Sequence, residues 1–159
     1  MAITGTPNTQ DPFAGWVVTP DLAREFMRDY PDMNPLVGGV EFSDKEIERA
    51  IQLTIGVANI TSRPTSYTVT NFPNPYVLLV GTASYLLKSE AMRQLRNEAT
   101  YQDGNIQPVG IDNKQQGYLQ MSGVLQQEFI QMVTSIKLQD NMNTFGQMRS
   151  PIAQSIHIR

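Results

Sequence analysis

The chain has 159 residues, of which 40% are hydrophobic and 17% charged, whereas about 25% charged residues is usual for a soluble domain. The absence of cysteine excludes disulfides and thiolate metal sites. A net charge of −3 argues against a surface that binds DNA by neutralising phosphates. The length suits one domain with an ordinary core, or a core with long arms, and so few charges favour a surface that is covered by neighbours.

Neither a secretion signal nor a membrane span is predicted. The first fifteen residues lack a basic region followed by an apolar core. The longest apolar stretch, YVLLVGTASYLL at residues 76–87, is shorter than the roughly 20 residues that cross a bilayer. We therefore expect the cytoplasm, or a particle assembled there.

A short amphipathic helix is predicted after an irregular N-terminal arm, residues 1–18. Thr19 suits the N-cap position, Pro20 the first helical position and Pro31 the end of the helix. One face repeats apolar residues every four positions: Leu22, Phe26 and Tyr30.

The second predicted helix, residues 44–60, has the clearest start signal. Ser43 and Glu46 form a capping box, and Phe42 before the cap is placed to contact Ile47. The predicted apolar stripe comprises Ile47, Ala50, Ile51, Thr54, Ile55, Val57 and Ala58.

A third helix is predicted from Pro75 to about residue 99. Its first half is apolar on every face, which is typical of a central buried helix. Gly81, Ala83 and Ser84 suit a close approach of neighbouring helices. The second half turns basic through Lys88, Arg93 and Arg96.

A protruding loop or short hairpin is predicted next, because an Asp-Gly turn signal stands between two larger side chains. A binding loop and a simple connection between helices are equally open interpretations of this segment. The candidate loop residues are Tyr101, Asp103, Gly104, Asn105 and Ile106.

The last predicted helix starts near Asp112 and ends before Asn141. Steps of four and three residues give it a packing seam, made of Tyr118, Ser122, Leu125, Phe129, Met132 and Ile136. The chain beyond, residues 141–159, is expected to be an extended arm.

The decapeptide SPIAQSIHIR, Ser150–Arg159, has strand-like spacing of its isoleucines and therefore needs a partner to pair with. Burying three isoleucines yields roughly 1.5–3 kcal/mol each, whereas ordering such an arm costs roughly 8–16 kcal/mol of backbone entropy. Binding to another subunit or partner is favoured over folding back on the same bundle. The candidate docking residues are Arg149, Pro151, Ile152, Ile156, His157, Ile158 and Arg159.

The sequence shows no pattern typical of catalysis, so we expect neither an enzyme nor a cofactor or metal site. The single histidine, His157, is more readily an interface residue than a ligand, and the Gly38-Gly39 pair lacks the lysine of a phosphate loop. Arg93 and Arg96 could contact nucleic acid or an acidic partner. The favoured interpretation is that they suit a helix C-terminus, with Glu90 and Glu98 in pairing distance. The remaining carboxylate pairs are expected on solvated faces: Glu46 with Glu48, and Asp29 with Asp32.

Together these elements predict a mainly α fold, an antiparallel bundle of about four helices with extended arms at both ends and a protruding loop or hairpin. The predicted division is an arm at 1–18, the bundle at 19–140 and an extended arm at 141–159.

The chain resembles the head-to-tail connector adaptors of tailed bacteriophages over most of residues 19–151. The resemblance lies in FMRDYPDMNPL, VEFSDKEIERAI, NFPNPYVLLVGTASYLL, RNEATYQDGNIQPVGI and NTFGQMRSP. Adaptors share helix order more than a diagnostic motif. The resemblance implies a structural virion protein that forms a homo-oligomeric ring, with twelve copies expected. The ring would dock on the portal protein, join it to the tail-side neck or stopper protein, and leave a channel for DNA without binding it specifically.

The resemblance also implies roles for the two unassigned segments. Docking on the portal falls to Arg149–Arg159, and a ring-lining or neck-facing role falls to Tyr101–Ile106. The alternatives are a tail-proximal neck or head-completion protein, or a helical peptide-binding assembly chaperone. In the chaperone hypothesis Met121 and Met132 would line a peptide groove.

Overall fold

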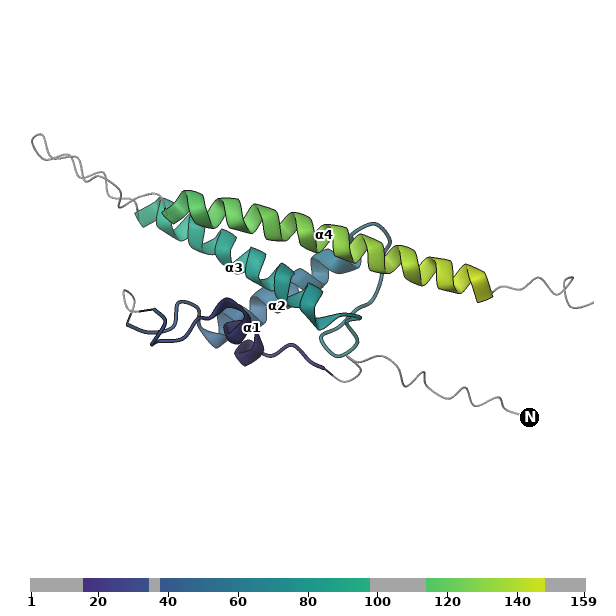
Figure 1. Cartoon of the computed structure of the whole chain (residues 1–159), viewed down its shortest axis with the longest axis horizontal. Coiled ribbons are helices and arrows are strands. Elements are labelled where there is room, and N and C mark those ends of the chain that lie inside the picture. The colour runs from purple at the N-terminus through teal and green to yellow at the C-terminus, as the bar shows by residue number, and fades with distance from the viewer. Residues whose placement is uncertain (1–15, 35–37, 98–113, 148–159) are drawn as a thin grey trace, which may run out of the picture.

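The computed structural model describes residues 16–34, 38–97 and 114–147, and this part of the chain contains helices and no strand. The helices are α1 (Pro20–Met27), α2 (Asp44–Ile60), α3 (Pro75–Asn97) and α4 (Lys114–Gln147). In Figure 1, α3 and α4 lie side by side and run in opposite directions, while α2 crosses behind α3 and the short α1 lies in front of α2. The predicted mainly α fold of packed helices is confirmed.

Helix α1 begins as predicted but ends earlier. The side chain of Thr19 accepts a hydrogen bond from the Leu22 N–H at 3.3 Å, and Pro20 is the first helical residue. The helix ends at Met27, because Arg28 adopts a left-handed conformation with φ of 57° and donates its N–H back to the last turn. The prediction that Pro31 ends the helix is therefore wrong by one turn.

Helix α2 has the predicted bounds, capping box and buried stripe. The Glu46 carboxylate accepts the Ser43 N–H at 2.8 Å, and Phe42 and Ile47 are buried in one apolar cluster. All the stripe residues are buried except Val57, which is 41% exposed. Val57 lies at the edge of a groove that no described residue covers.

Helix α3 is the central helix, as predicted, and contacts the other three. Val77, Leu78 and Val80 are at most 1% exposed. Gly81 marks the point where α2 and α4 approach α3, because a Cβ atom there would overlap Thr54 and would lie 2.7 Å from Cδ2 of Phe129. A glycine is needed at this crossing.

Helix α4 carries the predicted seam but is longer than predicted. Ser122 and Phe129 are buried and the other four seam residues are half-buried against α3 and the core. The helix continues to Gln147, so the expectation that it ends before Asn141 is wrong. With 34 residues against 23 in α3, α4 is about 50 Å long, compared with about 35 Å for α3, and its C-terminal end projects past α3 (Figure 1).

Candidate interaction surfaces

Both sets of predicted contact residues lie outside the described residues. This holds for the docking arm, Arg149–Arg159, with its isoleucines and His157, and for the loop Tyr101–Ile106. Their roles therefore stay predictions. The described helices carry candidate interaction sites of their own.

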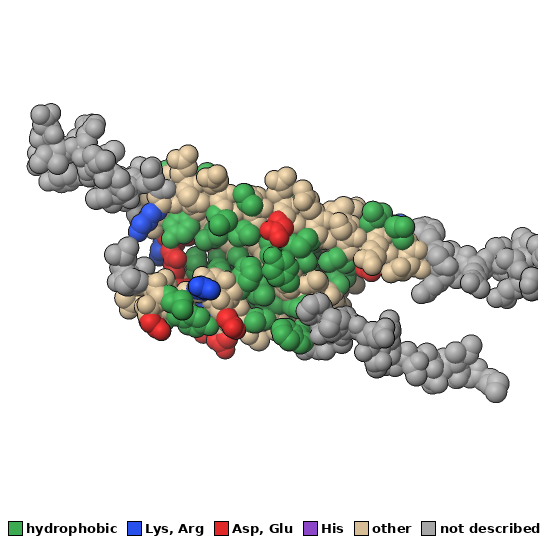
Figure 2. Space-filling view, viewed as in Figure 1, with side chains coloured by type: hydrophobic (Ala, Val, Ile, Leu, Met, Phe, Trp, Pro, Cys, Tyr) green, Lys and Arg blue, Asp and Glu red, His purple; other side chains and the backbone are tan. Residues whose placement is uncertain are grey.

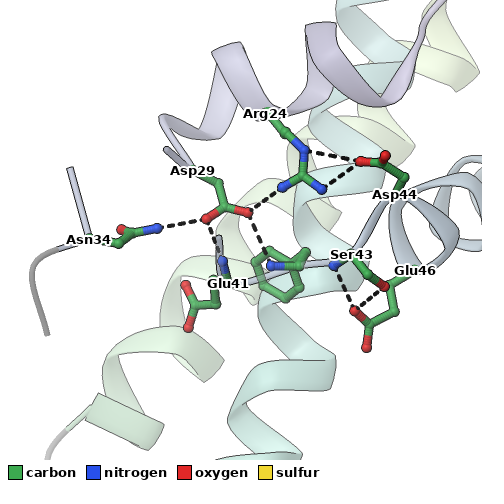
Figure 3. A network of polar contacts seen from close by, with 8 residues as sticks. Arg24, Asp29, Asn34, Glu41, Ser43, Asp44 and Glu46 are labelled. Carbon is green, nitrogen blue, oxygen red and sulfur yellow. Dashed lines mark hydrogen bonds and ion pairs between the residues drawn. The ribbon is translucent and has the colours of Figure 1, made fainter. Parts of the chain in front are cut away.

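A buried polar network joins the end of α1 to the start of α2 (Figure 3). Asp29 is only 4% exposed. Its carboxylate accepts from Arg24 Nη1 at 3.0 Å, from Asn34 Nδ2 at 2.7 Å, and from the backbone N–H groups of Glu41 and Phe42 at 2.6 and 3.1 Å. The expectation that Asp29 lies on a solvated face is wrong, because the chain folds back after α1 and brings these donors to it.

The same network reaches the first residue of α2. The Nη2 and Nε atoms of Arg24 donate to Oδ1 of Asp44 at 2.6 and 3.2 Å. Asp44 is largely exposed, whereas Arg24 is buried. Arg24 thus bridges a buried and an exposed carboxylate, and its role is to hold α1 against α2.

A second polar cluster lies where α3 approaches the start of α4. Glu90 is buried and accepts from Arg93 and Gln94 at 2.8 and 2.6 Å, so the expected pairing of Arg93 with Glu90 is confirmed. Glu41 accepts from the Tyr118 hydroxyl at 3.3 Å. Burial, followed by the charge of Glu90, raises the pKa of Glu41, and burial next to Glu41 raises the pKa of Tyr118 to about 12.

Lys137 caps the C-terminal end of α2, a role that the sequence pattern did not predict. Its Nζ atom donates to the carbonyl oxygens of Ala58, Thr61 and Arg63 at 2.5, 2.8 and 2.6 Å. It also lies 5.8 Å from the ring centroid of Tyr67. A cation suits the carbonyl end of a helix, although burial lowers the pKa of this amine.

An open apolar groove of about 350 Å³ lies between α2, α3 and α4. Its apolar walls stay solvent-accessible: Leu53, Val57, Tyr85 and Met92 are 41–57% exposed. Of the described residues that line it, Lys88 is the only charged one. We call this feature the groove and define it by Leu53, Val57, Tyr85, Lys88, Met92 and Phe129.

A second apolar surface lies on the other side of α3 and α4. Figure 2 shows hydrophobic side chains gathered over α1, α3 and α4, with one acidic group over α4 in their midst. The rings of Phe26 and Tyr76 meet edge to face at 6.1 Å, and the Tyr76 hydroxyl donates to Glu128 at 3.4 Å. We call this surface the Tyr76 face. It comprises Phe26, Tyr76 and Glu128, which contact one another, and the residues that helical spacing places on the same sides of α3 and α4: Leu87, eleven positions after Tyr76, and Met121 and Met132, seven before and four after Glu128.

The two methionines of the chaperone hypothesis belong to this second surface and not to the groove. Met121 is 54% exposed, and Met132 is half-buried against the core cluster of Val77, Val80 and Phe129. The methionine that lines the groove is Met92. Met121 and Met132 therefore do not line this groove, and their role in a peptide-binding groove stays a prediction.

Within the described ranges, no three His, Cys, Asp or Glu side chains are grouped so that they could hold a metal ion. Among the same residues, no helix combines the length and apolar character of a membrane span. Comparisons with protein-family models, with curated proteins and with solved structures find no match to this chain.

Proposed function

We propose that this chain is a structural virion protein, a head-to-tail connector adaptor that forms a ring, docks on the portal and joins it to the tail-side neck protein. The observation that carries the proposal is the presence of two separate apolar surfaces, the groove and the Tyr76 face, on one helical bundle. Large exposed apolar patches are typical of protein–protein contacts. A ring subunit needs at least two such contacts, one for each neighbour.

The charge distribution supports the same proposal. Only 17% of the residues are charged, and Arg24, Asp29, Glu90 and Lys137 among them are buried. These four groups therefore add little charge to the surface of the bundle. A net charge of −3 suits a ring through which DNA passes without being held.

The portal contact is assigned to the arm at Arg149–Arg159, on the basis of its sequence and the resemblance to connector adaptors. The test is co-sedimentation with a purified portal ring, comparing the full chain with a chain stopped after Arg149. Because α4 ends at Gln147, this truncation leaves every described helix complete. A matched control keeps the full length and changes Ile152, Ile156 and Ile158 to serine.

We expect the full chain to pellet with the portal and both variants to stay in solution. If both variants pellet as well, the arm is not the docking element. If the full chain does not pellet either, the connector function is wrong.

The groove supports a second candidate function, a helical module or assembly chaperone that binds a peptide. Its volume of about 350 Å³ lies at the lower end of the range for binding pockets. In that case the protein would bind an apolar peptide as a stable monomer and would not join the portal.

A further inference from the structure

We infer that the Tyr76 face of one subunit docks into the groove of a second copy, so that the subunits associate head to tail through these two different surfaces. The inference deepens the proposed function, on which it rests, by naming the contact that would build the ring.

The two surfaces lie on opposite sides of the same helices. Tyr76 and Tyr85 are nine residues apart on α3, which is about two and a half turns, so their side chains point in opposite directions. The contacts of the two tyrosines agree with this geometry. Tyr76 contacts Phe26 of α1 and Glu128 of α4, whereas Tyr85 lines the groove beside α2.

Two different, opposed surfaces favour a head-to-tail contact over a symmetric one. In a symmetric dimer the same patch of both subunits meets at a two-fold axis and leaves the opposite face bare. A contact between unlike patches leaves one free copy of each patch at the ends, so that further subunits add until a ring closes. Once the ring is closed, this contact covers both apolar surfaces of every subunit.

The two surfaces match in apolar character and in charge. The groove is hollow, and Lys88 is the one charged residue among the described residues that line it. On the Tyr76 face the side chain of Tyr76 is 47% exposed and that of Met121 is 54% exposed, and both can fill a hollow. The one charged member of this face is Glu128, of the opposite sign to Lys88. Opposite charges in complementary patches select the partner and its orientation.

A second copy is also the occupant that best fits the positive charge of the groove. A free apolar peptide would need no acidic group, whereas the Tyr76 face supplies a carboxylate to Lys88, the one cation among the described residues that line the groove. Both groups are part of the folded bundle, so no segment outside the described residues is needed for the contact.

The test is residue-specific cross-linking, which this chain suits because it contains no cysteine. Lys88→Cys and Glu128→Cys are made in separate chains, one of which carries a size tag, and the two are mixed with a short bismaleimide. The mixture is treated both alone and with a purified portal ring. We expect a tagged heterodimer from the mixture and little product from either variant by itself. A chain with both substitutions is expected to give a ladder beyond the dimer.

The matched control is Leu138→Cys, which is also on α4 and 59% exposed but belongs to neither surface. It is expected to give no product with Lys88→Cys. Adding Leu53→Asp to the Lys88→Cys chain places a charge in the groove and is expected to reduce the heterodimer at least tenfold. Circular dichroism verifies that this chain keeps its helices.

The inference is overturned if the mixture gives no more product than the Leu138→Cys control, with and without the portal. It is also overturned if Glu128→Cys links to itself as readily as to Lys88→Cys, because that result indicates a symmetric contact. A full chain that pellets with the portal but fails to cross-link refutes this contact and leaves the proposed function standing. If the chain neither pellets nor cross-links, both are refuted.

Discussion

Replacing Asp29 is expected to cost this protein a large part of its stability. The carboxylate is 4% exposed and accepts four hydrogen bonds, two from side chains and two from backbone N–H groups. In Asp29→Ala, the buried Arg24 loses one of its two carboxylates and keeps only the largely exposed Asp44. Breaking one side of a buried pair costs about 3–5 kcal/mol.

The measured loss of unfolding free energy is expected to lie at or below this range. Water can enter once the side chain is removed, and it can accept hydrogen bonds from some of the freed donors. Asp29→Asn keeps one carbonyl oxygen, so a smaller loss is expected. The measurement is urea-induced unfolding followed by circular dichroism, with the midpoint and slope both recorded. Amide exchange at Glu41 and Phe42 is expected to accelerate in Asp29→Ala, since Asp29 accepts both N–H groups.

The matched control is Asp32→Ala, because Asp32 is exposed and lies only three residues away. No measurable change in the unfolding midpoint is expected for it. If Asp29→Ala unfolds at the same urea concentration as Asp32→Ala, the network does not hold α1 to α2 and the reasoning is refuted.

Three further changes test the rest of the bundle. Gly81→Ala is expected to cost about 1–3 kcal/mol in urea unfolding, since its Cβ would lie 2.7 Å from Phe129; a neutral result would show that the helices separate freely there. Lys137→Met is expected to cost about 1–3 kcal/mol, because buried carbonyl oxygens at the end of α2 lose their donor, and an unchanged midpoint would contradict this role. Glu41→Gln is expected to remove a pH dependence of the free energy of unfolding. Because the pKa of Glu41 is raised in the folded state, the folded protein binds more protons at this site than the unfolded chain. Stability therefore falls as the pH rises from about 4.5 through the raised pKa. Unfolding midpoints measured across this range should stay flatter in Glu41→Gln than in the natural chain.

The parts of the fold that local sequence controls were predictable. Ser43 and Glu46 gave the start of α2 because a capping box is formed by residues three apart. Thr19 and Pro20 gave the start of α1 for the same local reason. The ends of the helices were harder to predict. Helix α1 stops at Arg28, whose left-handed conformation is not indicated by the sequence because Arg28 is not a glycine. Helix α4 continues through residues that lack an apolar pattern.

The parts that depend on distant residues were not predictable. Asp29 is buried because the backbone of residues 41 and 42 turns back to it, and no spacing in the sequence encodes that return. Lys137 had a weak signal, since it continues the buried series of Phe129 and Val133 at steps of four. A lysine at such a position indicates a buried partner, but the partner itself, the end of α2, is about 75 residues away in the chain.

The distribution of charges connects the stability of the bundle to its proposed assembly. The buried ions act within the subunit: Arg24 and Asp29 fix α1 to α2, and Lys137 fixes the end of α2 to α4. They hold the helices that form the groove and the Tyr76 face, so both surfaces exist before a neighbour arrives. A preformed surface binds without the cost of ordering new structure.

Self-association through these surfaces should therefore be independent of the arm. A chain stopped after Arg149 is expected to lose pelleting with the portal, yet the Lys88→Cys and Glu128→Cys forms of this shortened chain should still cross-link to each other. Loss of both properties on truncation would show that the arm, and not the bundle, joins the subunits.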